Sequence, residues 1–332
     1  MNLAQFPRRR YTAGQTPIEK LGRLSATLGG PEIYMKRDDL LGLAGGGNKT
    51  RKLEFLVADA LAQGADTLIT CGAVQSNHCR LTLAAAVKEG LKCRLVLEER
   101  VAGSYNPEAG GNNFLYRLLG VEKIEVVPGG SDMLQAMQRV ADEVAAEGRR
   151  AYVIPGGGSN PIGATGYVAC AQEILGQMFE QNLEFDRVVC ASGSTGTHAG
   201  LITGFAGSSS NLPVIGINVS RPKAEQEEMV YDLVRQTAAH VGVSFEISRE
   251  AVLCFGDYVG PGYSLPTDQM AEAVRMLARL EGILMDPVYT GKTMAGLIDL
   301  VRRGYFEKQE KILFVHTGGS PALHVYMSDI LD

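Results

Sequence analysis

Short apolar runs alternate with longer amphipathic segments along most of the chain. Eight runs are typical of β-strands: Ile33–Lys36, Thr67–Cys71, Arg94–Leu97, Ile124–Val127, Tyr152–Ile154, Val188–Ala191, Val214–Val219 and Ile312–His316. Seven segments favour helices: Arg51–Gln63, Arg80–Glu89, Asp132–Glu147, Ile162–Met178, Pro222–His240, Thr267–Glu281 and Lys292–Arg303. Because several strands are apolar at nearly every position, both of their faces should be covered. The alternation therefore predicts an α/β protein with doubly wound parallel sheets.

Composition and charge argue against several classes of partner. The 332 residues are enough for two lobes. A formal net charge of −5 gives no overall attraction to nucleic acid or to an anionic membrane. No apolar run reaches the ~18 residues of a membrane helix. The segment Met1–Arg10 holds three arginines and no apolar stretch, so we expect a solvated strand or arm there, no secretory signal, and a cytoplasmic protein.

The cysteines and histidines give no sign of a disulfide framework or a metal site. The six cysteines are scattered, without a C-x-x-C pair, and most lie in apolar surroundings. Buried free thiols are therefore the expected state. None of the five histidines pairs with cysteine or a carboxylate at metal-ligand spacing, so we expect no metal.

Glycine-rich segments lie at the ends of the predicted elements. Glycine accounts for 40 of the 332 residues, a high share. The segments are Gly45–Gly47, Gly110–Gly111, Gly129–Gly130, Gly156–Gly158 and Gly318–Gly319. Ligands of open α/β sheets bind at the carboxyl ends of strands, and glycine lets the backbone approach them closely. We therefore expect binding loops at these points.

A lysine follows the first of these segments, in Gly45-Gly46-Gly47-Asn48-Lys49-Thr50-Arg51-Lys52. Lys49 lies at the start of a predicted helix, where the helix dipole lowers the pKa of the amine. A neutral amine is what Schiff-base chemistry requires. The alternative is a solvated basic helix start, a description that fits Arg51 and Lys52 better than Lys49.

A second segment, Ala191–Gly200, reads Ala-Ser-Gly-Ser-Thr-Gly-Thr-His-Ala-Gly between a strand and a helix. A strand, a Gly/Ser/Thr loop and a helix start together bind phosphate through backbone N–H groups and hydroxyls. The loop lacks the lysine of a Walker motif and is not G-x-G-x-x-G. It therefore predicts a site for one phosphate of a small cofactor. A plain turn with serine as the helix cap is the alternative.

Three further segments carry weaker signals: Gln75-Ser76-Asn77-His78, Asp286–Thr293 and His316–Pro321. Ser76 and Asn77 either cap a helix or offer hydrogen bonds to a ligand. A single tyrosine such as Tyr289 is most often packed in a core, and Thr-Gly-Gly is most often a turn.

One Schiff-base lysine and one phosphate loop together fit pyridoxal 5′-phosphate (PLP). Five segments together resemble the 1-aminocyclopropane-1-carboxylate (ACC) deaminase and D-cysteine desulfhydrase family, which includes the L-cysteate sulfo-lyases. They are the glycine–lysine segment, Gln75–His78, the phosphate segment, Leu280–Tyr289 and Thr317-Gly318-Gly319. These are fold-type II PLP enzymes, similar to the tryptophan synthase β subunit. The resemblance covers nearly the whole chain.

The resemblance implies a role for each of a set of residues. Lys49 would bind PLP as an imine, Asn77 would contact its phenolate oxygen, and Ser76 would reach the substrate carboxylate. The implied catalytic residues are Lys49, Ser76 and Tyr289. The implied cofactor contacts are Lys49, Asn77, Ser194, Thr195, Gly196, Thr197, Thr290 and Thr317. The implied substrate contacts are Ser76, Asn77, His78, Tyr263 and Tyr289.

Two threonines separate the chain from one branch of this family. ACC deaminases carry Glu after the tyrosine that corresponds to Tyr289, and Leu where this chain has Thr317. Here both positions are threonine, Thr290 and Thr317, as in the desulfhydrases and sulfo-lyases. A neutral hydroxyl cannot keep the pyridine nitrogen protonated as a carboxylate would, and this favours prompt β-elimination. The alternative is that Thr290 only caps the helix near Lys292.

The predicted function is a PLP-dependent carbon–sulfur β-lyase. It would convert D-cysteine to pyruvate, ammonia and sulfide, or L-cysteate to pyruvate, ammonia and sulfite. ACC deaminase is the alternative within the family. A sulfonate would need cationic donors, for which Arg80 and Lys223 are candidates. The sequence of the segment Ser220–Glu228 resembles the sulfo-lyases more than the desulfhydrases. The rival from another class is a binding protein for a small phosphorylated ligand.

The resemblance also implies an organisation in two domains. A larger PLP-binding domain would combine residues 1–46 and 163–332, and residues 47–162 would form a smaller mobile domain. A homodimer that acts on a small amino acid, with no nucleic-acid or membrane partner, is expected.

Overall fold

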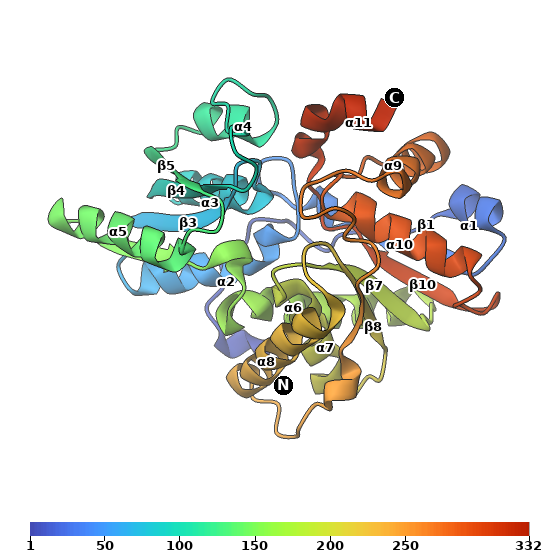
Figure 1. The fold of residues 1–332 in the computed structure, drawn as a ribbon. Helices are drawn as coiled ribbons and strands as arrows, with labels where there is room; N and C mark the ends of the chain where they lie inside the picture. The colour runs from blue at the N-terminus through green and yellow to red at the C-terminus, as the bar shows by residue number, and fades with distance from the viewer. Residues whose placement is uncertain (332) are drawn as a thin grey trace.

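The computed structural model describes residues 1–331, which form two sheets covered by helices (Figure 1). Within these residues the larger sheet has the order β1-β2-β10-β7-β8-β9 and the smaller β5-β4-β3-β6. The strands are β1 Ile18–Lys20, β2 Glu32–Lys36, β3 Thr67–Ala73, β4 Lys92–Glu99, β5 Lys123–Pro128, β6 Ala151–Ile154, β7 Arg187–Ser192, β8 Val214–Asn218, β9 Leu253–Phe255 and β10 Lys311–Val315. All pairings are parallel except that of β1 with β2. The predicted α/β class with parallel sheets is confirmed.

The helices cover both faces of each sheet. They are α1 Gly22–Leu28, α2 Lys49–Ala62, α3 Asn77–Lys88, α4 Asn112–Leu118, α5 Met133–Ala146, α6 Pro161–Gln181, α7 Gly196–Gly207, α8 Lys223–Val241, α9 Asp268–Glu281, α10 Thr290–Arg302 and α11 Met327–Leu331. All eight predicted strands and all seven predicted helices are present. The short strands β1 and β9 and the short helices α1, α4 and α11 had no sequence prediction.

Two apolar cores lie on opposite faces of the larger sheet. One face packs against α1, α9 and α10, with Leu24, Leu277 and Leu297 among its fully buried side chains. The other packs against α6, α7 and α8, where Ile174 and Leu201 are fully buried. Each such side chain contributes about 1.5–3 kcal/mol through its removal from water. The larger sheet is thus held in place from both sides.

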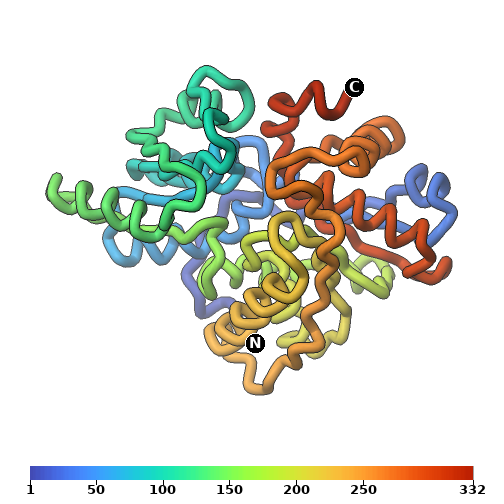
Figure 2. Tube along the Cα trace, in the orientation of Figure 1, coloured from blue at the N-terminus to red at the C-terminus, as the bar shows by residue number. Residues whose placement is uncertain are grey.

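The smaller sheet is covered in the same way. One face carries α2 and α3, with Leu56 and Leu81 fully buried, and the other carries α5, with Val140 and Val144 buried. In Figure 2 the chain runs from the larger sheet (blue) through the smaller one (cyan to green) and back (yellow to red). This division of the strands supports the proposed smaller domain at 47–162, although that boundary stays a prediction.

Helix α2 is anchored by a buried ion-pair network. The Arg51 guanidinium donates to both carboxylate oxygens of Asp38 at 2.8 Å and to both of Glu173 at 2.9 Å. The expectation that Arg51 and Lys52 form a solvated helix start is wrong, because both side chains are buried. The Arg51 side chain thus joins α2 to Glu173 in α6 and to Asp38, which follows β2. These bonds fix the end of α2 that carries Lys49.

The N-terminal segment is an arm rather than a strand, and it is only partly solvated. The backbone N–H of Arg9 donates to the carbonyl of Glu54 in α2 at 2.7 Å. The Arg8 guanidinium pairs with the Glu54 carboxylate at 2.5 Å and lies 5.2 Å from the centre of the Phe55 ring. Arg8 and Arg9 therefore pack against α2, while the Phe6 ring lies 4.8 Å from that of His240 in α8. Sequence composition could not indicate these contacts.

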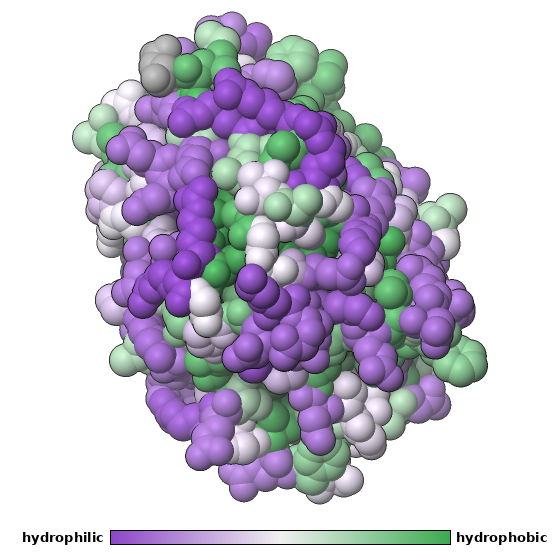
Figure 3. All heavy atoms as spheres, turned by 90° about the vertical axis from the view of Figure 1, so that its right-hand side faces the viewer, coloured by the Kyte–Doolittle hydropathy of each residue, from purple (hydrophilic) through white to green (hydrophobic). Residues whose placement is uncertain are grey.

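The cysteines and the surface of the described residues have the following features. The six cysteines are buried free thiols, as predicted. No helix within residues 1–331 has the length and apolarity to span a bilayer. On the face shown in Figure 3, polar side chains predominate and apolar side chains form patches between them.

Candidate active site

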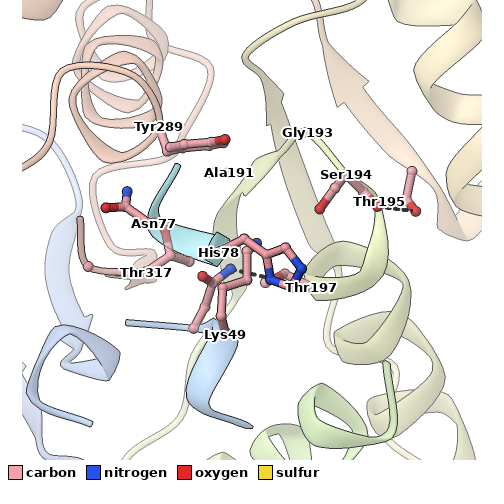
Figure 4. A pocket seen from close by; sticks show the side chains of 12 residues that line it. Lys49, Asn77, His78, Ala191, Gly193, Ser194, Thr195, Thr197, Tyr289 and Thr317 are labelled. Carbon is pink, nitrogen blue, oxygen red and sulfur yellow. Dashed lines mark hydrogen bonds between the residues drawn. The ribbon is translucent and has the colours of Figure 1, made fainter. Parts of the chain in front are cut away.

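The carboxyl ends of strands from both sheets meet at one pocket (Figure 4). From the smaller sheet, β3 leads into the start of α3; from the larger sheet, β7 leads into α7, and β10 leads to Thr317. The pocket is lined by Asn48, Lys49, Asn77, His78, Ala191, Gly193, Ser194, Thr195, Thr197, Tyr289, Thr317 and Gly318. Most of the residues singled out in the sequence therefore come together, although they are spread over 270 positions of the chain.

Lys49 is the first residue of α2 and follows a turn that needs glycine. Gly45, Gly46 and Gly47 all have positive φ, and a Cβ on Gly46 would overlap the carbonyl of Asp39. The turn brings the backbone N–H of Asn48 within 3.0 Å of the Thr317 carbonyl. The strand ends and the helix start are thus locked together beneath the pocket.

Burial lowers the pKa of the Lys49 amine to about 8. The sequence argument predicted a lowered pKa from the helix dipole, but removal of the side chain from water is the main cause. Asp286 acts in the opposite direction through its negative charge. The amine is therefore neutral in a sizeable fraction of molecules near neutral pH, as a nucleophile for a carbonyl group must be.

The loop 193–197 has the geometry of an anion cradle. Thr195 lies in the left-handed region at φ 73°, and α7 begins at Gly196. The backbone N–H of Gly196 and the hydroxyl of Ser194 both bond Ser159, at 3.2 and 3.0 Å. The start of this twelve-residue helix carries the positive end of the helix dipole, which favours a negative ligand.

Lys52 adds a buried cation beside this loop. Its amine donates to the carbonyl of Gly157 at 3.0 Å and lies 3.4 Å from the Ser159 hydroxyl. A Cβ on Gly196 would be only 2.8 Å from the same amine. Burial and the charge of Lys49 hold the pKa of Lys52 well below its usual value. The sequence analysis missed this residue, although spacing of three on one helix face links it to Lys49.

The start of α3 places Ser76, Asn77 and His78 differently. Ser76 caps the helix, because its hydroxyl accepts from the N–H of Cys79 at 3.2 Å. Asn77 does not cap the helix, and its side chain lines the pocket. The capping alternative is thus correct for Ser76 alone, whose side chain also lines the adjacent larger cavity.

His78 is a buried neutral imidazole. Its Nε2 lies 2.8 Å from the hydroxyl of Thr70, which donates its single proton to the carbonyl of Ile154 at 2.9 Å. Nε2 must therefore carry the hydrogen, and Nδ1 is left as an acceptor. Burial, with the charges of Lys49 and Lys52, holds the pKa of His78 well below its usual value.

A larger cavity of about 630 Å³ adjoins the pocket and is open to solvent. Its lining includes Lys49, Ser76, His78, Ser194, Tyr263 and Tyr289, together with Arg100 and Arg221. The hydroxyls of Tyr263 and Tyr289 are hydrogen-bonded to each other, and the Arg100 guanidinium carbon lies 4.2 Å from the Tyr263 ring centre. The predicted substrate contacts line this cavity, except Asn77, which lines the inner pocket.

The two threonines predicted at the pyridine nitrogen occupy different places. Thr317 lines the pocket. Thr290 is fully buried at the start of α10, where its hydroxyl donates to the Asp286 carboxylate at 2.7 Å and accepts from the Asp286 N–H at 2.9 Å. Thr290 is therefore the first residue of α10, outside the pocket lining, and its hydroxyl bonds Asp286 and does not cap the helix.

Asp286 organises this loop, a role that the sequence analysis did not assign. Its carboxylate accepts from the backbone N–H groups of Val288, Tyr289 and Thr290 at 2.8–2.9 Å. Burial nevertheless raises the pKa of this carboxyl. Because the carboxylate is bonded within its own loop, it positions Tyr289 and does not line the pocket.

Arg80 and Lys223, the predicted sulfonate contacts, do not line the cavity. Arg80 is fully buried beneath Asn77. Lys223 is exposed at the start of α8 and lies 3.8 Å from Glu227. Arg100 and Arg221 are the arginines of the cavity wall. Arg221 belongs to the segment Ser220–Glu228 singled out in the sequence, whereas no motif marked Arg100.

The donor set fits PLP. Lys49 offers a nucleophilic amine, Asn77 an amide, and the loop at Ser194–Thr197 a phosphate cradle. Lys52 supplies a buried amine that has no carboxylate within ion-pair distance among residues 1–331, and its lowered pKa disfavours the charged form while no anion is present. A phosphate monoester held by the adjacent loop would supply a negative charge and so favour protonation of this amine.

Comparison with known proteins supports the same cofactor. The family model described as pyridoxal-phosphate dependent enzyme matches residues 10–318. The chain is 49% identical over 325 residues to the D-cysteine desulfhydrase of Yersinia enterocolitica, which covers 98% of this chain and 97% of that protein. It superposes on the crystal structure of an ACC deaminase homologue with a TM-score of 0.88 and 40% identity, over 99% of this chain and 97% of the other.

A more distant structure shows the fold alone. O-ureido-L-serine synthase has a TM-score of 0.67 and 20% identity, over 97% of this chain and 94% of that chain. The pocket geometry, the family match and the two similar proteins agree. The chain belongs to the fold-type II family of pyridoxal-phosphate-dependent enzymes, in the group that contains D-cysteine desulfhydrase and ACC deaminase homologues.

Proposed function

We infer that this enzyme is a PLP-dependent carbon–sulfur β-lyase acting on a cysteine-like amino acid, with D-cysteine as the substrate. The observation that carries the choice against ACC deaminase is the side chain of Thr317 in the pocket, in a lining that contains no carboxylate among the described residues. The Yersinia relative, named a D-cysteine desulfhydrase, supports both the reaction and the substrate. The likeness to the ACC deaminase homologue has lower identity and favours that activity less.

PLP, when bound, withdraws electrons from the substrate Cα and so allows its proton and then the β-sulfur to leave. Lys49 lines the cavity and is suited to take that proton, because burial lowers the pKa of its amine to about 8. Ser76 lines the same cavity and offers a hydroxyl to the substrate carboxylate. Tyr289 is held by the Asp286 loop and hydrogen-bonded to Tyr263, so its hydroxyl has a fixed position in the cavity.

L-cysteate is a second candidate substrate, favoured by the arginines of the cavity. Arg100 comes from the end of β4 and Arg221 from the loop after β8, so both sheets contribute a cation. Glu98 pairs with Arg100 at 2.6 Å and is the one acidic side chain in the lining that the structure describes. Arg221 pairs at 3.2 Å with Glu225, which is not part of the lining. The lining itself thus keeps a positive excess, which would suit a sulfonate.

The deciding experiment measures pyruvate from D-cysteine, L-cysteine, L-cysteate and D-serine, and 2-oxobutanoate from ACC, with sulfide and sulfite determined separately. We expect the highest kcat/KM for D-cysteine, with sulfide equal to pyruvate. Faster ring opening of ACC than release of pyruvate from any sulfur substrate would overturn the proposal.

A variant separates the two sulfur substrates. Arg100→Gln should lower kcat/KM for L-cysteate by about tenfold or more and change that for D-cysteine much less, because a charge-assisted hydrogen bond is lost. Arg117→Gln is the matched control, since Arg117 is exposed and pairs only with the exposed Glu108. Equal losses for both substrates would exclude a sulfonate role for Arg100.

We further propose that the enzyme is a cytoplasmic homodimer. The support is the resemblance to the family, together with buried free thiols of a kind that persist in a reducing compartment. Light scattering of the purified holoenzyme tests the oligomeric state.

A further inference from the structure

Arg80 is a buried cation without an ionic partner. Its side chain is fully buried in α3. The guanidinium donates to Asn77 Oδ1 at 2.9 Å, to Asn112 Oδ1 at 2.7 Å and to the carbonyl of Gly46 at 2.9 Å. Within residues 1–331 it forms no ion pair with a carboxylate, and its Nε has no hydrogen-bond partner.

An isolated charge in such a place is destabilising. Burial lowers the pKa of Arg80 to about 10, and the charges of Tyr116 and Asp286 oppose this shift only in part. Neutral amide and carbonyl oxygens satisfy the N–H groups but do not neutralise the charge. A buried, uncompensated guanidinium beside a cofactor pocket indicates that a bound anion completes the arrangement.

The residue between Arg80 and the pocket is Asn77. Its Oδ1 accepts from Arg80 and from Asn112 Nδ2, at 2.9 and 3.0 Å. Because two donors surround this oxygen, the amide can have only one orientation, with Nδ2 on the other side. A Cβ on Gly319 would lie 2.8 Å from Nδ2, so the glycine leaves room around this donor.

Asn112 strengthens the same arrangement. Its Nδ2 also donates to the carbonyl of Gln75 at 2.8 Å, and its backbone N–H donates to the Gln75 side chain at 2.8 Å. Asn112 is fully buried at the start of α4. Arg80 and Asn112 therefore form a rigid support behind the carbonyl side of Asn77, and only the N–H side remains for a ligand in the pocket.

We propose that Arg80 is a positioning residue that holds Asn77 as a hydrogen-bond donor to the phenolate oxygen of PLP, and that this oxygen supplies the negative charge which Arg80 lacks. The proposal rests on the assignment of the pocket to PLP. A donor in contact with the phenolate and a positive charge behind it both stabilise the anionic oxygen. They lower the affinity of the cofactor chromophore for a proton.

The test is a pH titration of the visible absorbance of the holoenzyme, which needs no turnover. Arg80→Met should raise the pH midpoint of the absorbance change by about one unit or more, because a nearby positive charge is removed. Arg80→Lys keeps a charge but cannot form the three contacts, so its shift should be smaller. Arg139→Met is the control, since Arg139 is exposed and pairs with Glu125, and it should titrate as wild type.

A double variant tests whether Arg80 acts through Asn77. Asn77→Ala should raise the midpoint, and adding Arg80→Met should shift it by less than Arg80→Met does alone, because only the direct effect of the guanidinium charge is then left to lose. Fully additive shifts, or a wild-type midpoint in Arg80→Met, would overturn the proposal.

A further variant covers the case in which Arg80→Met does not fold. Asn112→Ala removes one donor from Asn77 Oδ1 and should move the midpoint upward as Arg80→Lys does. Wild-type midpoints in both Asn112→Ala and Arg80→Lys would contradict the proposal. The proposed function fails separately, if a normal chromophore forms but no pyruvate is released.

Discussion

Lys49 and Lys52 lie one helical turn apart on α2, and both amines are buried. Burial lowers the pKa of Lys49 to about 8, and burial with the charge of Lys49 lowers that of Lys52 further from its usual value. One amine faces the site of carbonyl chemistry, and the other lies beside the loop at Ser194–Thr197. A phosphorylated aldehyde complements both, because its aldehyde reacts with the neutral amine of Lys49 and the negative charge of its phosphate would raise the pKa of Lys52 and favour its protonated form.

The first prediction concerns the pH dependence of cofactor uptake. In the apoenzyme, the rate of reaction with PLP should rise with pH and level off above about 8, because only the neutral form of Lys49 attacks the aldehyde. With a pKa of about 8, roughly a tenth of the amine is neutral at pH 7, far more than for an ordinary lysine. Stopped-flow absorbance measures the rate. A rate that rises only above about pH 10 would contradict the lowered pKa.

The second prediction concerns Lys52. Lys52→Met should weaken PLP binding to the apoenzyme by about 10- to 100-fold, because a hydrogen bond to a charged group contributes about 1.5–3 kcal/mol. Binding of pyridoxal, which has no phosphate, should change little. Titration of both ligands by absorbance measures the two affinities, and the exposed Lys308→Met serves as control. Equal losses for PLP and pyridoxal would place Lys52 away from the phosphate.

The larger elements of this fold are predictable from the sequence because their signals are local. A strand such as β7 is an apolar run, and the helix start at Lys49 follows a glycine turn. Strands β1 and β9 have three residues each and lie at the edges of the sheet, too short to show a periodicity. Tertiary pairing alone makes them strands.

The residues of the site that belong to local sequence motifs are predictable too, whereas those brought in by contacts between distant segments are not. Lys49, Asn77 and the loop at Ser194 belong to segments whose residue types already indicate chemistry. Lys52 does not, because its role depends on the carbonyl of Gly157, 105 positions away. Arg100 lies in the cavity wall, 4.2 Å from the ring of Tyr263, a residue far away in the sequence. Such long-range approaches leave no pattern in a single sequence.

The third prediction compares two glycines with nearly the same φ. Gly157 has φ 70° and Gly90 has φ 71°, so with alanine at either position the left-handed backbone alone, before any clash, should cost about 1 kcal/mol of stability. A Cβ on Gly157 would overlap the Ser194 hydroxyl, whereas no atom lies within 4 Å of a Cβ on Gly90. Gly157→Ala should therefore also weaken PLP binding, and Gly90→Ala should leave it unchanged. Thermal unfolding and PLP titration measure both effects.

The PLP affinities of Gly157→Ala and Gly90→Ala must be compared with each other. If Gly157→Ala binds PLP as tightly as Gly90→Ala does, Ser194 can move without consequence and is not part of the phosphate cradle. If both variants lose affinity, the effect is a general loss of stability.

The fourth prediction concerns the buried network behind α2. Arg51→Met should lower the free energy of unfolding by about 3–5 kcal/mol at pH 7, because it leaves the Asp38 carboxylate buried without its cation. Arg302→Met is the control, since Arg302 forms an exposed pair with Glu272, and it should cost at most about 1 kcal/mol. Urea unfolding measures both values.

The same network sets an acid limit on stability. Burial alone would raise the pKa of Asp38, but the Arg51 guanidinium holds it below its usual value. A carboxyl with a lowered pKa stabilises the fold fully above its unfolded pKa of about 4, and this contribution is lost as the pH falls through the lower folded value. In Arg51→Met the Asp38 carboxyl loses its cation and can take up a proton more readily. The difference in free energy of unfolding between wild type and Arg51→Met should therefore become smaller as the pH falls from 7 to 4. A gap that stays constant over this range would show that Asp38 is not the group whose charge makes Arg51 necessary.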